Sequence, residues 1–299
     1  MNTTTKTTAR KMAPQLLVRI LSGARNYFRR LSAWAEVIGC VRGATPVDNM
    51  RLWLSALVSP VSSLSQLSTW REPQLLFETD VVARDIGVFG IRAHSDDLGH
   101  LLPSGIGGLL RAMAARLKPG DTVLDAGANI GAVTIFLAKH VGPTGRVIAV
   151  EMMPDTARRL RRHIALNGLT NVEVVENALA ARAGLSVTAS VPEGFFGQAS
   201  IASELQGKGR KVAQVQTTTI DHVTQSLPFV HLIKLDLEGA EEEALDGATQ
   251  TLAKTNAIVF ESWTGERGLS EILVNKGFSV SPVDARNFLA LAHAALAFC

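Results

Sequence analysis

The sequence predicts an α/β fold with a mostly parallel sheet, helices on both of its faces, and a helical N-terminal extension. Two observations carry this prediction. From about residue 118, short apolar runs alternate with segments of helix length, as in strand–helix–strand units with right-handed crossovers. Acidic residues end the first two runs, and a glycine-rich turn follows the first. Because 299 residues can bury a large core and still carry an extension, we expect domains at 1–72 and 73–299.

The first 42 residues are basic, with eight basic side chains and one acid giving a net charge of +7, so the remainder carries −4. Apolar residues recur there at spacings near three and four, and Pro14 can begin a helix. An amphipathic helix over 14–39 can pack on its own chain, support a homodimer, bind an acidic partner or contact a membrane peripherally. We expect no nucleic-acid partner, because a recognisable binding motif is missing and the core is acidic.

Cysteine content and hydropathy indicate the cellular compartment of the protein. The two cysteines, Cys40 and Cys299, lie far apart and lack metal-ligand spacing. Apolar stretches are all shorter than the ~20 residues that span a bilayer, and the N-terminus lacks the pattern of a secretory signal. These features predict a cytoplasmic protein.

Between residues 47 and 117 the sequence predicts two helices separated at Pro60, a hairpin of strands 75–79 and 88–92, and a helix over 107–117. A polar cluster follows the hairpin: His94, Asp96, Asp97 and His100. Its spacing fits no standard metal site, so a solvated polar loop is the favoured interpretation. His94 and His100 are secondary candidates for a catalytic base.

The first strand of the alternating region ends at Asp125, and Gly127 and Gly131 bracket the turn before a helix over 131–140. A glycine there admits a close ligand, and the helix start offers unpaired N–H groups. The pattern differs from the G-x-G-x-x-G of nicotinamide sites, because an acid at the strand end would repel a phosphate. Asp125 can instead attract a cation, which favours S-adenosylmethionine.

The next two strands end at Glu151 and near Val175, with a helix over 155–167 between them. Glu151 can hold a ribose diol with its two carboxylate oxygens, and Met152 can pack on the adenine or fill the core. Ligands bind beyond the carboxyl ends of such strands, which brings these residues together. The predicted cofactor residues are Asp125, Gly127, Asn129, Gly131, Glu151, Met152, Asn177 and Ala178.

Four ordered motifs, at residues 125–131, 146–151, 161–168 and 233–241, resemble the FkbM family of S-adenosylmethionine-dependent methyltransferases. The resemblance runs from about residue 118 to 262. It implies a Rossmann-like class I methyltransferase fold and, usually, methylation of a hydroxyl group on a sugar or specialised metabolite. The family more often has a Pro-Asn-like pair after the position of Glu151, where this chain has Met152 and Met153.

The fourth strand, 229–235, contains Lys234, which breaks an otherwise apolar strand and must be paired, with Asp236 as the nearest candidate. Asp236 and Glu238 follow the strand and are the predicted catalytic residues, because a carboxylate can take up the proton of a hydroxyl acceptor. Mg²⁺ held by Asp236, Glu261 and Ser262 is an alternative that we do not favour, because Ser is a poor substitute for Asn as a ligand.

An insertion between the third and fourth strands contains the predicted acceptor-binding residues Phe195, Phe196, Gln198 and Ser200. The alternative is a hairpin whose aromatic side chains pack on the core. A helix over 270–276, the segment 278–282 and an apolar tail over 288–298 should complete the sheet. Two functional alternatives stay open: a non-catalytic cofactor-binding subunit, and a carboxyl or amine acceptor.

Overall fold

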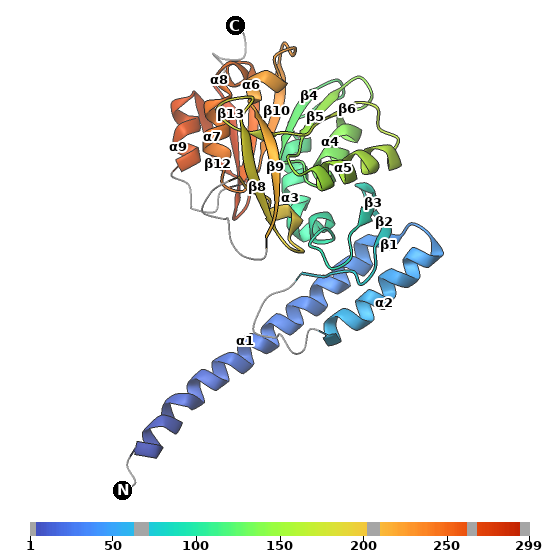
Figure 1. Cartoon of the computed structure of the whole chain (residues 1–299), viewed down its shortest axis with the longest axis vertical. Helices are drawn as coiled ribbons and strands as arrows, with labels where there is room; N and C mark the ends of the chain where they lie inside the picture. Colours follow the sequence, from blue (N-terminus) through green and yellow to red (C-terminus); the bar gives the residue numbers. More distant parts are fainter. Residues whose placement is uncertain (1–3, 63–71, 202–209, 262–267, 294–299) are drawn as a thin grey trace.

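We describe the fold from a computed structural model of the chain. It describes residues 4–62, 72–201, 210–261 and 268–293, without the side chains of 4–21, 61–62 and 210–211. Two long N-terminal helices precede an α/β core, and the described strands form three sheets (Figure 1).

The central sheet has seven strands. In spatial order they are β12 (Phe278–Pro282), β13 (Asn287–Ala292), β11 (Thr255–Glu261), β10 (Val230–Leu235), β4 (Thr122–Ala126), β5 (Arg146–Val150) and β6 (Val172–Val175). The five strands from β11 to β6 pair in parallel, whereas β13 is antiparallel to both of its neighbours. This order and direction confirm the predicted Rossmann-like class I methyltransferase fold.

Alternate residues of the central strands enter two separate cores. Val123 and Leu232 pack in one core with α3 (Pro103–Ala114) and α4 (Ala132–Val141). Leu124 and Ile233 pack in the other, with the helices α6 (Ile220–Val223), α7 (Glu241–Asp246), α8 (Thr249–Leu252) and α9 (Gly268–Asn275). Both faces of the sheet are therefore covered, as parallel strands require. Beside α4, α5 (Pro154–Leu166) packs against β5 and β6.

The insertion forms a small sheet of its own, in the order β7 (Ala178–Leu179), β9 (Arg210–Thr218) and β8 (Ser186–Pro192). The short 3₁₀ helix η3 (Phe196–Gln198) follows β8, and a bridge between Ser190 and Ser200 returns the segment to the sheet. We call residues 193–200 the flap. Its backbone is thus tied to the small sheet at both ends.

The N-terminal region consists of α1 (Thr4–Cys40), β1 (Val41–Gly43) and α2 (Pro46–Ser62). β1 pairs with a hairpin of β2 (Thr79–Ala83) and β3 (Gly87–Ile91). This sheet joins residues on both sides of position 72, where we expect a domain boundary. That boundary stays a prediction. Figure 1 shows α1 and α2 projecting together from the α/β core. We call residues 4–62 the arm.

Several local expectations were wrong. Helix α1 begins before Pro14, which occupies an interior position and forgoes one backbone hydrogen bond there. Pro60 lies inside α2 instead of ending it. The first hairpin strand starts at Thr79 and not at Leu75. Among the described helices, none is both long and apolar enough to cross a lipid bilayer.

Candidate active site

A cavity of about 370 Å³ opens at the carboxyl ends of β4, β5 and β10. Its walls come from the loops after these strands, from the flap, from α3 and from the 3₁₀ helix η2 (Gly99–Leu101). Among the predicted site residues that line it are Gly127, Asn129, Glu151, Met152, Asn177, Ala178, Phe195, Phe196, Gln198, Asp236 and Glu238. Most of the predicted site residues thus lie at this cavity, beyond the strand ends or on the flap, and the ligand that each of them contacts stays a prediction.

The turn after β4 is fixed by its neighbours on both sides. The N–H groups of Gly127 and Ala128 donate to the carbonyl oxygen of Val150, at 3.0 and 2.9 Å. Gly127 has φ = 81°, and a Cβ at this position would lie 1.8 Å from the carbonyl oxygen of Asp236. Only glycine therefore lets the loops after β4 and β10 approach this closely.

Gly127→Ala should disrupt the cavity, because the added methyl group meets backbone that cannot rotate away. A positive φ alone costs an alanine about 1–2 kcal/mol, and the overlap with Asp236 adds to it. We expect a lower midpoint of urea unfolding and loss of S-adenosylmethionine binding by calorimetry. Gly168→Ala is the matched control, because Gly168 also has positive φ but has open space around its Cβ position. Equal effects of the two substitutions would contradict the steric explanation.

Glu151 follows β5 and is almost completely buried. Its two carboxylate oxygens accept hydrogen bonds from the N–H groups of Asn129 (3.0 Å) and Met153 (2.8 Å). Burial raises the pKa of Glu151 to about 7, although these two N–H donors oppose the shift. A carboxylate held in one orientation at the cavity wall is suited to accepting hydrogen bonds from a diol.

Lys234 links three parts of the site. Its Nζ donates to the carbonyl oxygen of Gly127 at 2.7 Å and lies 3.3 Å from Asp236 Oδ2 and 3.5 Å from Asp125 Oδ1. Burial disfavours the charge, but the carboxylates of Asp236 and Asp125 hold the pKa of Lys234 above its usual value. The expected pairing with Asp236 is confirmed.

Three predicted site residues do not line the cavity. Asp125 is fully buried, and its Oδ2 accepts a hydrogen bond from Thr134 Oγ1 at 2.6 Å. Its Oδ1 lies 3.5 Å from Nζ of Lys234, which does line the cavity. Gly131 is the N-cap of α4, with φ = 92°. A Cβ there would lie 2.4 Å from Leu160 Cδ1, so glycine at this position lets α4 and α5 pack closely. Ser200 is buried, and its Oγ donates to the carbonyl oxygen of Glu238 at 2.9 Å.

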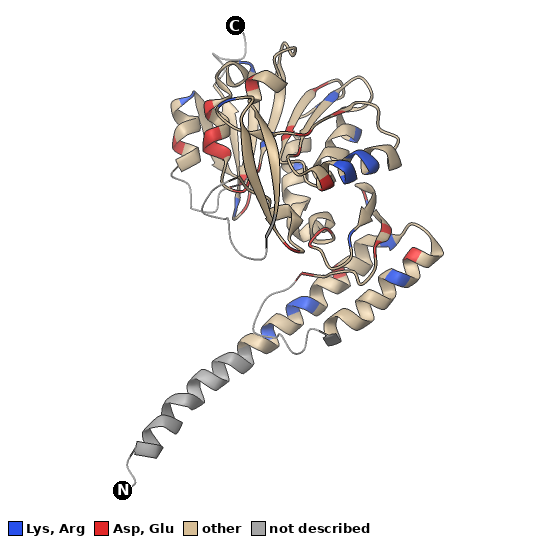
Figure 2. Ribbon diagram, viewed as in Figure 1, with Lys and Arg blue, Asp and Glu red and all other residues tan. Residues whose placement is uncertain are grey.

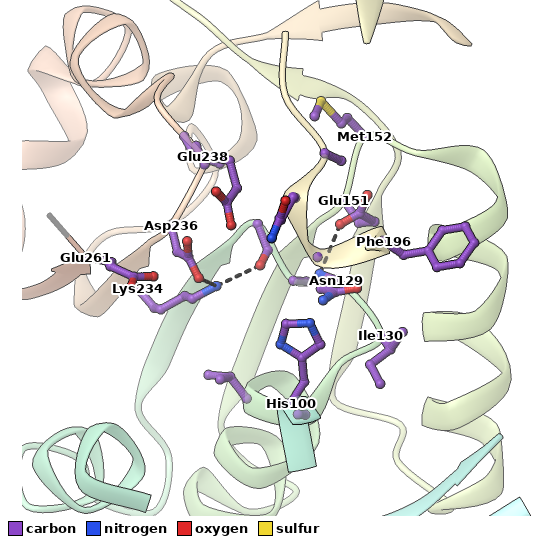
Figure 3. A pocket seen from close by; sticks show the side chains of 18 of the residues that line it. His100, Asn129, Ile130, Glu151, Met152, Phe196, Lys234, Asp236, Glu238 and Glu261 are labelled. Atoms are coloured by element: carbon purple, nitrogen blue, oxygen red, sulfur yellow. Dashed lines mark hydrogen bonds and ion pairs between the residues drawn. The ribbon is translucent and has the colours of Figure 1, made fainter. Parts of the chain in front are cut away.

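Glu238 lies in the loop after β10 with φ = 52°, a conformation that non-glycine residues rarely adopt. The bond from Ser200 holds its carbonyl group, and Glu241 accepts from the N–H groups of Leu237 and Gly239 on either side. Burial and the nearby carboxylates of Asp236 and Glu261 raise the pKa of Glu238 to about 7. In Figure 3, Glu238 and His100 point into the cavity from opposite sides.

The loop over residues 92–100 holds the flap, so the expectation of a solvated polar loop was wrong. Asp96 Oδ1 and Oδ2 accept from the N–H groups of Phe196 and Gly197, at 2.9 and 3.1 Å. Asp97 is fully buried and forms a paired ion contact with Arg92. These carboxylates are buried because they replace water with N–H donors.

The flap places its two aromatic rings differently. Phe195 lines the cavity and is partly exposed. The guanidinium of Arg92 lies 3.6 Å from the centre of the Phe196 ring, and Figure 3 shows that ring pointing away from the carboxylates. Phe196 also lines the cavity, but its ring already stacks on a side chain of the protein. Gln198 lines the cavity near Phe195.

Sequence reasoning left out several lining residues. Glu72 and Arg286 come from segments far from the motifs, and Ile106 and Leu109 come from α3. His100 was only a secondary candidate, yet its Nε2 lies 3.5 Å from Asp96 Oδ2. Burial opposes its charge, but Asp96 raises the pKa of His100 above its usual value. The sequence contained a signal for this contact, because His100 follows Asp96 by four residues, a spacing that brings two side chains together when the chain turns helically.

The residues present suit S-adenosylmethionine. Glu151 offers fixed oxygens for a ribose diol, and the buried Oδ1 of Asn129 has no hydrogen-bond partner among the described residues. Met152 and Ala178 offer apolar contact for an adenine ring. Asn177 also lines the cavity, but its amide donates to the carbonyl oxygen of Gln216.

For the alternative of Mg²⁺, the described residues contain no group of three or more His, Cys, Asp or Glu side chains placed to hold a metal ion. Of the ligands considered, Asp236 and Glu261 line the cavity, and Ser262 lies outside the described residues. Glu261 Oε1 lies 3.4 Å from Arg286 Nη1. Both carboxylates therefore already face a cation of the protein.

The chain is similar to known methyltransferases. Methyltransferase sdnD of Sordaria araneosa is 27% identical over 205 residues, covering 56% of this chain and 77% of that protein. The arsenite methyltransferase of Halobacterium salinarum is 43% identical over 59 residues, or 20% of this chain. That match covers only 15% of the length of the arsenite methyltransferase.

Among solved structures, Aeropyrum pernix fibrillarin with bound S-adenosylmethionine aligns with 61% of this chain and 74% of its own, at 15% identity and a TM-score of 0.38. The family description "Methyltransferase FkbM domain" matches residues 125–289, which is more than half of the 299 residues. That range begins at Asp125 near the end of β4 and contains the glycine turn, Glu151, the flap and Glu238. The chain therefore belongs to the FkbM family of S-adenosylmethionine-dependent methyltransferases.

Proposed function

We propose that the protein is an O-methyltransferase that methylates a hydroxyl group of a small molecule, such as a sugar or a specialised metabolite. One observation carries the proposal: Glu238, with a pKa raised to about 7, faces the same cavity that Glu151 borders on the cofactor side. A base with a pKa near the working pH is suited to taking a proton from a hydroxyl group.

The charge of the cavity supports this class of acceptor. Four carboxylate side chains line it, namely Glu72, Asp236, Glu238 and Glu261. The main cationic side chains in the lining are Lys234 and Arg286. Carboxylate oxygens accept hydrogen bonds from hydroxyl groups, whereas a carboxylate or phosphate acceptor would face like charges. The lining therefore favours hydroxyl over carboxyl acceptors. A protonated amine would also bind, but it has no free electron pair for methylation.

The residues have separate roles in this proposal. Bound S-adenosylmethionine supplies an activated methyl group on a sulfonium centre. Glu238 accepts the proton that the acceptor hydroxyl loses as its oxygen is methylated. Asp236 orients the acceptor and is itself held by Lys234, at 3.3 Å. Phe195 and Gln198 contact the acceptor from the flap, and Ser200 fixes the position of Glu238. Alignment by such fixed groups supplies much of the rate enhancement in transfer reactions.

A class screen tests the proposal. The protein is incubated with S-adenosylmethionine carrying an isotopically labelled methyl group and, separately, with hydroxylated sugars and metabolites, carboxylic acids and primary amines. We expect labelled product and S-adenosylhomocysteine with hydroxylated compounds, both reduced in Glu238→Gln. Labelled esters or methylamines would replace the proposed acceptor class. Cofactor binding by calorimetry without turnover in any class would favour a non-catalytic subunit.

Binding of S-adenosylmethionine should weaken as the pH falls below about 7. The pKa of Glu151 is raised to about 7, so its carboxylate gains a proton there and loses acceptor capacity for the ribose hydroxyls. Linkage limits the loss of affinity to about tenfold per pH unit. Calorimetry between pH 5.5 and 8.5 measures it. S-adenosylhomocysteine, which has the same ribose, should follow the same curve, and Glu151→Gln should flatten both. An unchanged slope in Glu151→Gln would assign the titration to another group.

A further inference from the structure

The outward face of α2 is apolar. Its exposed large side chains are Val47, Met50, Trp53, Leu54, Leu57 and Val58. They recur at spacings of three and four, and therefore form one stripe along the helix. Met50 and Leu57 expose 63% and 69% of their surface. An apolar stripe of this length normally has a partner.

The opposite face of α2 already packs on the protein. Leu52 and Ser55 are buried, and Ser55 Oγ accepts a hydrogen bond from the N–H group of Leu76. Only Asp48 and Arg51 are charged in the helix, and Figure 2 shows it mostly without charged residues. A helix that is apolar on both faces is stable in water only if the second face is also covered. The packing on the core therefore leaves half of α2 to a partner.

The neighbouring α1 supplies positive charge. Arg25 and Arg29 are exposed, and Phe28 between them exposes 69% of its surface. Further toward the core, Trp34 and Val37 are buried in the main hydrophobic core, which confirms that α1 packs in part on its own chain. The arm is thus anchored at one end, with arginines and apolar residues exposed beyond the anchor.

We propose that the arm docks on an anionic lipid surface, with the apolar stripe of α2 and Phe28 entering the interface and the exposed Arg25 and Arg29 of α1 facing lipid headgroups. Interfacial helices combine these features: large apolar and aromatic side chains with Lys and Arg nearby. Residues 1–42 carry a net charge of +7, which favours an anionic over a neutral surface.

A second copy of the chain fits this face less well. The acids of residues 1–62 are Glu36 and Asp48. Glu36 accepts from the N–H group of Ser104, and Asp48 accepts from Thr45 Oγ1. Both carboxylates already accept hydrogen bonds within their own chain. The arm of a second copy would therefore have few acidic side chains available to pair with the basic residues of α1. Two such segments would instead bring like charges together.

The contact between Glu36 and Ser104 also links the arm to the cavity. Ser104 lies in the first turn of α3, and the neighbouring Gly105 and Ile106 line the cavity. An arm bound to lipid would therefore hold this wall of the cavity close to the membrane surface.

Vesicle sedimentation of the full chain tests the proposal. The vesicles contain phosphatidylcholine alone, or phosphatidylcholine with phosphatidylglycerol as the minority lipid. We expect at least about tenfold stronger partition onto the anionic vesicles, weakening as salt is added. The double variant Trp53→Glu/Leu57→Glu should lose at least about tenfold of this partition, and Arg25→Glu should reduce the preference for anionic lipid. Circular dichroism and calorimetry with S-adenosylmethionine check that each variant is folded.

Val274→Glu is the matched control, because Val274 is a similarly exposed apolar residue on α9, outside the arm. It should bind vesicles like the unchanged protein. Three results would overturn the proposal: no binding to either vesicle, equal loss in Val274→Glu, or a dimer in light scattering that Trp53→Glu/Leu57→Glu separates. The last result would assign the face to a second copy.

Discussion

Lys234→Met should lower the free energy of unfolding by about 3–5 kcal/mol, the range found when one partner of a buried ion pair is removed. Lys234 Nζ is the cation beside Asp125, which is fully buried and otherwise accepts a hydrogen bond from Thr134. The same substitution frees the carbonyl oxygen of Gly127 and the carboxylate of Asp236. Binding of S-adenosylmethionine should therefore also weaken, which urea unfolding and calorimetry together would show.

Two further variants separate charge from packing. Lys254→Met is the matched control, because Lys254 Nζ donates to the carbonyl oxygens of Thr224 and Leu227 and forms no ion pair with a carboxylate in the described part of the chain. The loss of these two bonds should cost about 1–3 kcal/mol, less than the loss of the buried cation at Lys234. Asp125→Asn added to Lys234→Met removes the unpaired charge and should recover part of the lost stability. If the double variant is as unstable as the sum of the single ones, the two side chains are not coupled.

The central fold was predictable because its signals are local. Strand-length apolar runs ending at Asp125 and Glu151, with helices between them, predict a parallel sheet whose strand ends form the site. Lys234 was a further local signal, since an isolated lysine in a buried strand must be paired. Its contact with Asp236 is confirmed, and the contact with Asp125 follows from the pairing of β10 with β4.

What sequence reasoning missed depends on contacts between distant segments. Asp96 holds the N–H groups of Phe196 and Gly197, a hundred residues further along the chain. Nothing in the local pattern of the polar loop shows such a partner, so a solvated loop was the reasonable expectation. Ser200 was assigned to the acceptor for the same reason, although its hydroxyl group bonds to the backbone of Glu238. A polar side chain in an insertion does not reveal whether it faces a ligand or another loop.

Glu238→Gln should reduce kcat by about 10²–10⁴-fold, the usual contribution of a positioned general base. The substitution keeps the shape of the side chain but removes its ability to accept a proton. Affinity for S-adenosylmethionine should change little, because Glu151, and not Glu238, borders the cofactor side in our proposal. Steady-state production of S-adenosylhomocysteine, with an acceptor found in the class screen, measures kcat. Glu243→Gln is the matched control, because Glu243 is an exposed acid of the neighbouring α7.

The pH dependence of kcat identifies the base independently of how far kcat falls in Glu238→Gln. Only the ionised form of Glu238 can take up a proton, and its pKa is raised to about 7. At saturating cofactor, kcat of the unchanged protein should therefore rise about tenfold per pH unit up to about pH 7 and then level off. Glu238→Gln should lose this rising limb. If the limb persists in Glu238→Gln but disappears in Asp236→Asn, Asp236 takes the proton; if both variants keep full turnover and the limb, neither carboxylate is the base.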